Sequence, residues 1–452
     1  MGKRFLSFAE GYAEHFELKT RDIGQQAQQY LCGLMQSRRR NMERMAEVVP
    51  DSNEQALQHF LSSSDWDDRG VLDQVAQEAD GMLGGGQDTA LLLDESGFTK
   101  KGKCSVGVAR QYNGRLGKVD NCQVGVFAAL NRGNRVTLID KRLYLPESWT
   151  SDSERCELVG IPKAYRQFKT KPELALEMVR HSRNLGVRFA WVGFDGLYGN
   201  TPAFLRALDD DGEVFVGDVH KNQLIYLSDP QPVLPPRKGN RGRKPSKRVT
   251  ELTPMRVDAW ADEQPQEAWR RVELRHATRG KLTVEVLHRE VWLWDGKEAQ
   301  ARQWRLIIRR ECANHEERKY SLSNAPDSVC IRRLARMQGQ RYWIERGFQD
   351  GKSEVGMTHY QARGWKSWQH HMTLVMMAML FLLKERLLNE EDHPLLSCAD
   401  IVRLLCGFLP ARDRGADELI RQLEIRHRKR AASIEFFTEK QRLEDVGAVG
   451  SM

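Results

Sequence analysis

The spacing of hydrophobic residues predicts helices at both ends of the chain and strands in between. Residues 1–85 carry apolar side chains every three or four positions, which is the period of an amphipathic helix, and a long helix is expected over 20–48. Beyond three consecutive glycines at 84–86, short apolar runs replace this period. Such runs are typical of strands buried on both faces, so a sheet is expected to follow the helical N-terminal part.

Two of the expected strands end in an aspartate. The run 89–94 is almost wholly apolar and ends in Asp94, and the run 187–195 ends in Asp195. Further strands are expected over 122–130, 135–145 and 213–219, and helices over 172–185 and 202–208. In a mixed sheet built in this order, the ends of the first and fourth strands can be neighbours, so Asp94 and Asp195 are expected at one edge.

The pattern changes again after residue 220. Apolar and polar residues alternate, which indicates a β-rich insertion. Its strands are expected over 272–276, 282–287, 290–294 and 304–309. Its tryptophans Trp292, Trp294 and Trp304 suit stacking on an unpaired base, although aromatic residues in strands more often belong to a core. Helices are then expected over 331–355, 365–388, 398–408 and 416–433, followed by a disordered end.

One stripe of the helix expected over 331–355 carries charged residues of both signs. Arg341, Glu345, Phe348 and Lys352 recur at the spacing of a single helix face. One interpretation is a surface helix with charge pairs four residues apart. The other is a carboxylate metal ligand flanked by cations that hold phosphates. The two strand-end aspartates favour the second, because they supply the partners such a ligand needs.

The charge of the chain favours a polyanionic partner. Its 452 residues carry a net charge of +8, with a pI near 9.0. Residues 237–248, called the basic loop below, contain seven bases and no acid: Arg237, Lys238, Arg241, Arg243, Lys244, Lys247 and Arg248. A solvated loop and a DNA-binding loop both fit, and counterion release favours DNA. An arginine cluster at 38–40 leaves DNA binding and a helical cap on the next domain equally open.

Other features point to a protein of the cytoplasm. The eight cysteines form no C-x-x-C pair, so free thiols in a reducing compartment are expected. The N-terminus shows no apolar signal segment, and the longest apolar run, 372–383, is too short to span a bilayer. No membrane partner is therefore expected.

Three sequence blocks together resemble the DDE transposases of bacterial insertion sequences, in particular the group with a Y-x2-R-x3-E-x6-K signature. Arg341, Glu345 and Lys352 match the last three letters at the right spacing, whereas Gln338 stands at the tyrosine position. The blocks Leu-Leu-Leu-Asp-Glu-Ser-Gly-Phe and Val-Gly-Phe-Asp-Gly-Leu-Tyr-Gly place Asp94 and Asp195 in matching contexts, and His-Tyr-Gln-Ala-Arg-Gly-Trp follows the glutamate. The resemblance covers roughly residues 50–390.

The resemblance implies a ribonuclease-H-like catalytic domain that cuts and joins DNA. Asp94, Asp195 and Glu345 would be the catalytic carboxylates and would hold two Mg²⁺ ions, which Mn²⁺ can replace. Arg341 and Lys352 would hold backbone phosphates. The partners would be double-stranded DNA, as element ends and target, and further copies of the chain in a dimer or larger assembly. Glu95, expected on the other strand face, and Asp218 with His220 compete for the metal-binding roles.

The expected fold is therefore α/β, with a ribonuclease-H-like mixed sheet. Its parts are a helical N-terminal domain over 1–85, a candidate for DNA binding; the first catalytic part over 86–220; the β-rich insertion over 221–330; the last catalytic part over 331–390; and a helical C-terminal region over 391–452. Two other functions stay open: a catalytically idle DNA-binding derivative, and a metal-dependent nuclease without strand transfer.

Overall fold

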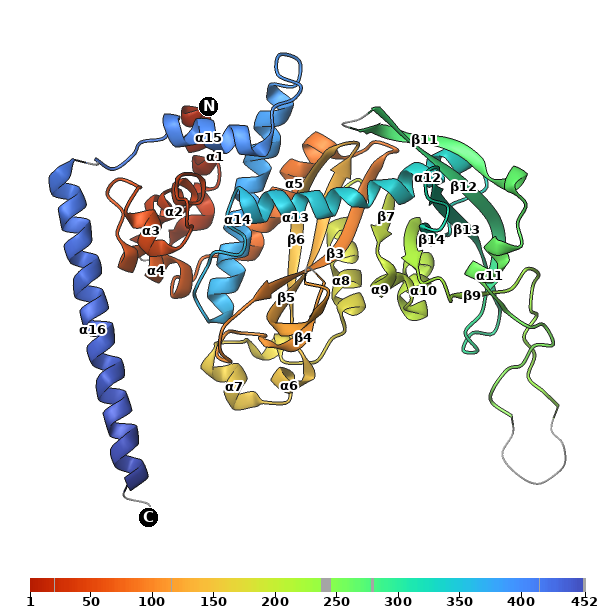
Figure 1. The fold of residues 1–452 in the computed structure, drawn as a ribbon, viewed down its shortest axis with the longest axis horizontal. Helices are drawn as coiled ribbons and strands as arrows, with labels where there is room; N and C mark the ends of the chain where they lie inside the picture. Colours follow the sequence, from red (N-terminus) through yellow and green to blue (C-terminus); the bar gives the residue numbers. More distant parts are fainter. Residues whose placement is uncertain (20, 115, 237–244, 278–279, 414, 450–452) are drawn as a thin grey trace.

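Ten strands of the described chain form one mixed sheet, on which the other elements pack (Figure 1). The computed structural model describes residues 1–19, 21–114, 116–236, 245–277, 280–413 and 415–449. The strands are β3 (Thr89–Thr99), β4 (Ala109–Asn113), β5 (Lys118–Arg132), β6 (Arg135–Tyr144), β7 (Trp191–Phe194), β8 (Phe215–Val219), β11 (Arg270–Ala277), β12 (Gly280–Leu293), β13 (Arg302–Glu311) and β14 (Arg318–Ser323). Their order is β11-β12-β13-β14-β8-β7-β3-β5-β4, and β6 pairs with β5.

Two adjacent pairings at the centre of the sheet are parallel. β3 pairs with β7, and β7 pairs with β8, in the same direction, whereas the other pairings are antiparallel. Parallel central strands are buried on both faces, which explains why β3 and β7 read as almost continuous apolar runs. The prediction of a mixed α/β fold with helices at both ends is confirmed.

The insertion strands continue the same sheet. β14 pairs with β8 through the register Ser321↔Asp218, so the strands β11 to β14 extend the central sheet on its β8 side. The two strands expected over 282–287 and 290–294 are one continuous strand, β12, and β14 was not expected. A polar stretch, His288 to Glu290, interrupts the alternation within β12 and hides its continuity. Two short strands within the insertion, β9 (Leu224–Ile225) and β10 (Met255–Arg256), pair with each other.

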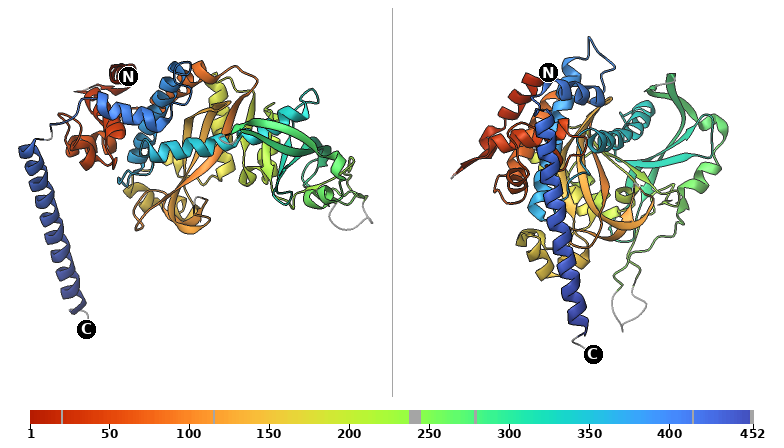
Figure 2. Two further views of the ribbon diagram at one scale, coloured as in Figure 1. Left: turned by 45° about the horizontal axis from the view of Figure 1, so that its top comes forward. Right: turned by 60° about the vertical axis from the view of Figure 1, so that its left-hand side comes forward.

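Helices cover the central strands, and helices from both ends of the chain gather on the side opposite the insertion strands (Figures 1 and 2). They are α1 (Gly2–Glu10), α2 (Gly24–Gln36), α3 (Met42–Ala46), α4 (Glu54–Ser62), α5 (Asp68–Leu83), α6 (Glu147–Thr150), α7 (Ser153–Leu158), α8 (Lys171–Asn184), α9 (Gly196–Gly199), α10 (Pro202–Asp210), α11 (Val257–Asp262), α12 (Ile331–Gln340), α13 (Tyr342–Ser353), α14 (Trp365–Leu388), α15 (Cys398–Phe408) and α16 (Ala416–Val449). The buried α14 contacts α2, α4 and α5, so it joins the N-terminal helices to the sheet.

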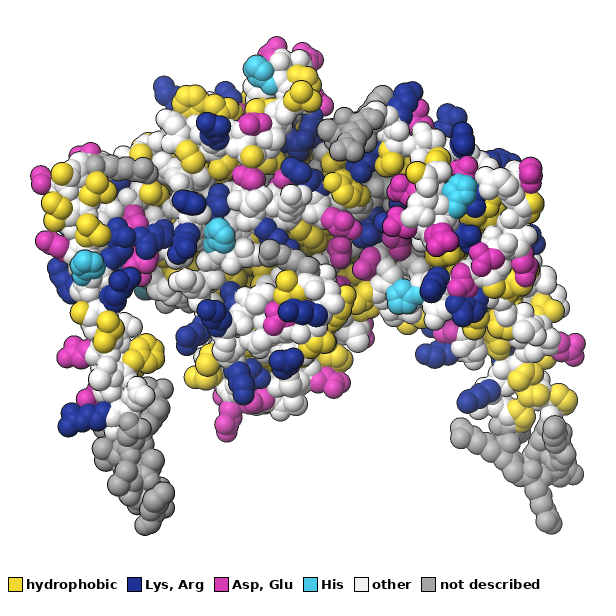
Figure 3. All heavy atoms as spheres, viewed as in Figure 1, with side chains coloured by type: hydrophobic (Ala, Val, Ile, Leu, Met, Phe, Trp, Pro, Cys, Tyr) yellow, Lys and Arg dark blue, Asp and Glu magenta, His cyan; other side chains and the backbone are white. Residues whose placement is uncertain are grey.

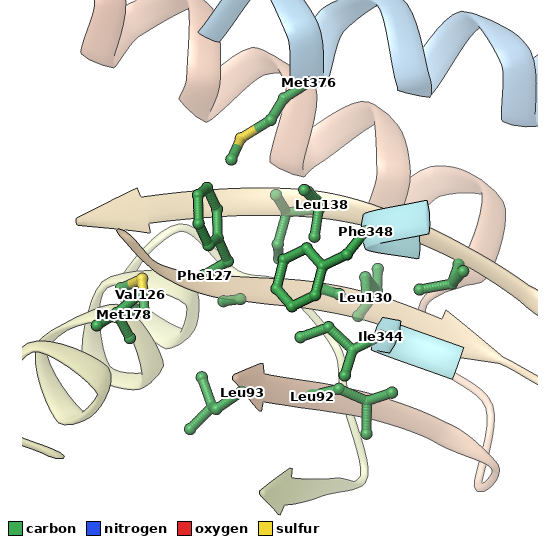
Figure 4. Packing of buried hydrophobic residues seen from close by; sticks show 14 of the residues in the cluster. Leu92, Leu93, Val126, Phe127, Leu130, Leu138, Met178, Ile344, Phe348 and Met376 are labelled. Atoms are coloured by element: carbon green, nitrogen blue, oxygen red, sulfur yellow. The ribbon is translucent and has the colours of Figure 1, made fainter. Parts of the chain in front are cut away.

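The two faces of the sheet are covered by different helices. Val126 of β5 lies beside Met178 of α8, whereas the next residue, Phe127, lies beside Phe348 of α13 (Figure 4). The rings of Phe127 and Phe348 meet edge to face, with 5.4 Å between centroids. The alternation of strand side chains thus assigns α8 to one face and α13 with α14 to the other.

Two long helices predicted from the sequence are each interrupted. The helix expected over 20–48 is divided into α2 and α3, because Arg40 turns inward and donates to the carbonyls of Leu34, Ser353 and Glu354. The arginine cluster at 38–40 therefore contributes one buried structural residue. The helix expected over 331–355 is divided at Arg341, although α12 and α13 follow almost one axis (Figure 1).

The C-terminal helix is longer than predicted. α16 continues to Val449, so the prediction of a disordered end from about residue 440 is wrong for this stretch. Away from its first turns, the helix projects from the rest of the molecule (Figure 2). No helix within the described residues has the length and apolarity needed to cross a membrane.

Candidate active site

A cavity of about 1480 Å³ opens where the central strands end. It is lined by the middle of β3, by residues at the ends of β7 and β8, by part of α13 and by residues in and near β14. Its lining includes six carboxylates: Asp94, Glu95, Asp195, Asp218, Glu316 and Glu345. Figure 3 shows acidic side chains on both sides of the hollow between the central body and the insertion strands. This cavity is the strongest candidate for chemistry in the described chain.

The parallel pairing of β3 and β7 sets Asp94 beside Asp195. Leu93 and Phe194 are partners in the register, so Asp94 and Asp195 follow at the same level. β7 ends there, whereas β3 continues to Thr99 in its pairing with β5, so the prediction that its strand ends at Asp94 is wrong. Asp195 also begins α9, where its Oδ1 accepts the backbone N–H of Leu197 at 3.0 Å. The Asp94 Oδ1 accepts the N–H of Glu95 at 2.7 Å. Both aspartates are thereby held in place by backbone donors.

Helix α13 brings a third acid to the cavity from far along the chain. Ile344 and Phe348 are buried and pack toward β3 and β5 (Figure 4). This docking leaves Arg341, Glu345 and Lys352 beside the cavity, which all three line. The residues Arg341, Glu345 and Lys352 thus share the predicted stripe, but its apolar member, Phe348, belongs largely to the core.

The guanidinium of Arg341 lies between the acids. Its NH2 is 3.0 Å from Oε1 of Glu345, its Nε is 3.1 Å from Oδ2 of Asp218, and its NH1 is 3.7 Å from Oδ2 of Asp94. Burial alone would lower the pKa of Arg341, but Asp218, Asp94 and Glu345 raise it overall. The guanidinium therefore remains charged and acts as a common counter-ion for acids of three elements.

Burial and mutual repulsion make the two aspartates difficult to ionise. Burial, with Asp195 as the next cause, raises the pKa of Asp94 from 3.8 to about 8. Burial, followed by the charge of Glu95, also raises the pKa of Asp195. Strongly raised carboxyl pKa values in a cavity are typical of functional sites, because a fold has no structural need to gather like charges.

The donor set suits a hard divalent cation, although the acids are not gathered around one point. Carboxylate oxygens are the ligands that Mg²⁺ prefers. Within the described residues, no three His, Cys, Asp or Glu side chains lie close enough together to hold one ion. Arg341 explains this arrangement, because it occupies the space between Asp94 and Glu345. Asp94 and Asp195 fit a divalent ion, and a cation shared with Glu345 would have to displace the guanidinium.

The sequence did not reveal the residues that hold Arg341. Asp218 accepts a hydrogen bond from Ser321 Oγ at 2.6 Å, and Ser321 Oγ in turn accepts one from Gln338 Nε2 at 2.7 Å. Gln338, at the tyrosine position of the signature, is therefore a buried anchor for this chain of contacts. The sequence distinguished Gln338 only as a departure from the signature, and no sequence pattern pointed to Ser321.

The other acid beside Asp94 has partners of its own. Glu95 is 2.8 Å from Lys171 Nζ of α8 and accepts a bond from the hydroxyl of Tyr198 at 3.3 Å. Its partners lie on the α8 face of the sheet, as the alternation of β3 predicted, although Glu95 still borders the cavity. The charge of Glu95 acts on Asp195, and the ion pair with Lys171 balances part of that charge.

The predicted cationic residues lie in different places. Lys352 lines the cavity, with Nζ 5.6 Å from the centre of the Phe348 ring. Residues 237–244 of the basic loop lie outside the described residues. They include five of its seven predicted bases: Arg237, Lys238, Arg241, Arg243 and Lys244. Of the remaining two, Lys247 is exposed, and Arg248 donates to the carbonyl of Pro232 at 3.1 Å.

The predicted stacking tryptophans do not form an exposed platform. Trp304 is buried and packs edge to face against Phe215, with 5.2 Å between ring centroids. Trp292 and Trp294 are half-buried, and Trp294 donates its indole N–H to the carbonyl of Glu298 at 3.0 Å. Core packing accounts for Trp304, in agreement with the simpler interpretation.

Comparison with known proteins finds one family and a curated relative. A family model described as DDE superfamily endonuclease matches residues 13–281. A probable transposase for insertion sequence element IS701, from Microchaete diplosiphon, is 26% identical over 334 residues, which are 72% of this chain and 74% of that protein. The family match includes Asp94 and Asp195 and ends before α13.

Proposed function

The chain belongs to the DDE superfamily of endonucleases, and on that premise we propose that it is a DNA transposase of the insertion-sequence type. It binds the ends of its element, cuts there and inserts the freed DNA elsewhere. The observation that carries this proposal is that Asp94, Asp195 and Glu345 line one cavity, although α13 follows the strands by a long stretch of chain. The mixed sheet, in which the parallel strands β3 and β7 set Asp94 and Asp195 side by side, supports a ribonuclease-H-like core.

In this proposal, Asp94, Asp195 and Glu345 hold two Mg²⁺ ions, or Mn²⁺ in their place. The bound ions supply charge that activates the attacking oxygen and stabilises the leaving oxygen. The raised pKa of Asp94 supports the assignment, because a divalent cation beside these acids would offset the burial and repulsion that raise it. Asp218 serves another purpose, since it holds Arg341 through Nε.

The residues of the chain position DNA for the reaction. Arg341 and Lys352 hold backbone phosphates beside the acids, as a fork and as a point charge. The basic loop, including Lys247 and Arg248, holds phosphates farther along the duplex. The helical N-terminal domain over 1–85 adds a DNA contact of its own, and two copies of the chain bring two element ends together in the cytoplasm.

The reaction consists of two displacements at phosphorus. Water first attacks the phosphodiester at an element end, and the 3′-oxygen leaves as a hydroxyl while the phosphate stays on the 5′-oxygen of the adjoining fragment of the same strand. The 3′-hydroxyl then attacks a phosphodiester of the target and displaces another 3′-oxygen. Each step breaks one P–O bond and forms one, so no covalent protein intermediate and no external energy source are required.

Substitution of the acids tests the assignment. Asp94→Asn, Asp195→Asn and Glu345→Gln are expected to bind element-end DNA as the parent does and to lose cleavage and strand transfer. Gel-shift and plasmid-cleavage assays measure both properties, and pre-cut ends measure transfer alone. Full cleavage by Asp94→Asn would refute the assignment of that acid. Cleavage by the parent without joining of pre-cut ends would reduce the function to that of a nuclease.

A further inference from the structure

A second cavity, of about 550 Å³, lies in the insertion and carries charge opposite to that of the acidic one. We call it the cationic cavity. It lies between α11, the start of β11, strands β12 and β13, and the start of α12. Its lining contains three arginines, one histidine and no acid: Trp260, Gln264, Ala268, Arg270, Leu287, His288, Arg289, Arg305, Cys330 and Ile331.

The cationic cavity occupies a gap at the edge of β12. Strand β11 covers this edge only as far as the pair Arg270↔Val286, and the next partner is Tyr226, which bridges Trp292. Tyr226 and Trp292 exchange both backbone hydrogen bonds, each 2.9 Å long. Since backbone groups alternate along a strand, His288 directs its own N–H to the same open edge. The gap therefore offers a main-chain donor among cations.

Arg305 makes the cavity rigid. Its side chain is buried, and it donates to the carbonyls of Pro326 and Val329 at 3.0 and 2.7 Å, which fixes the segment before α12. Its Nε donates to Nε2 of His288 at 3.0 Å. That bond makes Nε2 the acceptor, so the proton of the neutral ring is on Nδ1, which remains a donor.

The local potential is strongly positive. Burial, followed by the charges of Arg305 and Arg270, lowers the pKa of His288 to about 4, although Asp327 acts in the opposite direction. The ring is therefore neutral at physiological pH and donates hydrogen bonds without adding to the repulsion. Nearby acids offset the cations only in part: Asp327 acts less on His288 than Arg305 and Arg270 do, and Glu290 is exposed and accepts from Gln303.

The start of α12 adds further donors. The helix has ten residues, no side chain caps its N-terminus, and no acid lies in its first turn. The N-terminal N–H groups and the positive end of the helix dipole thus act beside the arginines. Arg270 and Arg289 are exposed, and no side-chain hydrogen bond or ion pair of theirs occurs among the described residues.

We infer that the cationic cavity binds a phosphate group of the DNA backbone, at a second contact on the insertion, away from the acids. Arg270 and Arg289 supply charge, His288 and the first turn of α12 supply hydrogen bonds, and Arg305 holds the frame. Trp260 and Leu287 form an apolar floor, against which a sugar packs. Binding of DNA rests on the proposed function, whereas binding of a phosphate does not.

The test removes the two exposed charges. Arg270→Gln with Arg289→Gln is compared with Arg403→Gln with Arg428→Gln, which removes two exposed cations of α15 and α16, outside the parts proposed to bind DNA. Affinity for a labelled duplex is measured by anisotropy between about 50 and 200 mM salt. Loss of the one phosphate bound there lowers the slope of log K against log salt by about 0.9, so the decrease in affinity across this range becomes about 3.5-fold smaller. The control pair is expected to keep the parent slope.

A second measurement separates the site from the function. Inorganic phosphate is expected to raise the melting temperature of the parent and of Asp94→Asn, and to raise that of the Arg270/Arg289 variant less. If the parent binds no DNA but this phosphate effect holds, the proposed function fails and the anion site stands. If phosphate discriminates between the variants while the DNA slope does not, the site binds free anions only and the DNA assignment is wrong. An unchanged slope together with an unchanged phosphate effect overturns the inference entirely.

Discussion

Replacing Asp94 by asparagine is expected to stabilise the metal-free protein. Asparagine reproduces the shape of the protonated acid but cannot ionise. The pKa of Asp94 rises from 3.8 in the unfolded chain to about 8 in the folded one, chiefly through burial and then through Asp195. The folded protein must therefore either hold a proton on this group or bear an unfavourable charge, and the variant avoids both.

The size of the gain follows from the two pKa values. A tenfold change in ionisation corresponds to about 1.4 kcal/mol. At pH 7, ionisation of the unfolded chain favours unfolding by about 4 kcal/mol through this group, and at pH 5 by about 2 kcal/mol. Since the folded pKa is the higher one, the contribution of Asp94 to stability is complete below about pH 4 and is lost as the pH rises to about 8. The gain from asparagine therefore grows with pH.

Urea unfolding in a chelating buffer between pH 5 and pH 8 measures this gain. An exposed acid in the turn after α14 gives a matched control, Glu391→Gln, for which a change within about 0.5 kcal/mol is expected. Added Mg²⁺ should narrow the difference between the parent and Asp94→Asn, because an ion that binds only the folded parent stabilises it. A variant that is less stable than the parent, or a gain that does not grow with pH, would show that Asp94 is not the strained acid its raised pKa indicates.

Three further outcomes are expected. Replacing the seven bases of the basic loop by glutamine should weaken DNA binding and reduce the salt slope by about 0.9 for each phosphate that the loop no longer binds, whereas an unchanged slope would mean a solvated loop. Arg341→Lys should cleave DNA poorly in a plasmid assay although lysine keeps the positive charge. One ammonium group cannot pair with Asp218, Glu345 and Asp94 as the guanidinium does. Full activity of this variant would show that the guanidinium group is not required. Arg40→Met should lower unfolding free energy by about 2 kcal/mol or more, since it leaves buried carbonyls without donors, and unchanged stability in urea would contradict that role.

The helices α14 and α15 and the neighbouring positions of Asp94 and Asp195 were the features that the sequence predicted best. The bounds of α14 and α15 agree with the expected ranges, because a long apolar run defines the first and Ser397 caps the second with Asp400. The resemblance to DDE transposases is confirmed by the family match. Asp94 and Asp195 are neighbours because the apolar runs before them form adjacent parallel strands, and each run is visible locally in the sequence. The continuation of β3 beyond Asp94 to Thr99 was not predicted.

Features that depend on distant contacts were not predictable in this way. The inward turn of Arg40 depends on carbonyls at the end of α13, more than 300 residues later. Likewise, Arg341 was expected to face phosphates, but its position among the acids depends on Asp218, which β8 provides, and on Ser321, which β14 provides. No local sequence pattern indicates such partners. The sequence therefore identified the charged stripe but not the residues that pair with Arg341.

Because β14 pairs with β8, the insertion contains outer strands that can be exchanged between related proteins and an inner strand that cannot. β11 and β12 lie farthest from the acids, and alterations there change an outer surface. β14 is different, because its Ser321 contacts both Gln338 and Asp218, and a slip of one residue in its register would turn that hydroxyl to the opposite face. Chimeras between related proteins should therefore exchange the outer hairpin at the β12–β13 turn and keep β14 with its parent core. The junction of such a chimera should therefore lie within the sheet, and not at the boundary where the β-rich sequence begins.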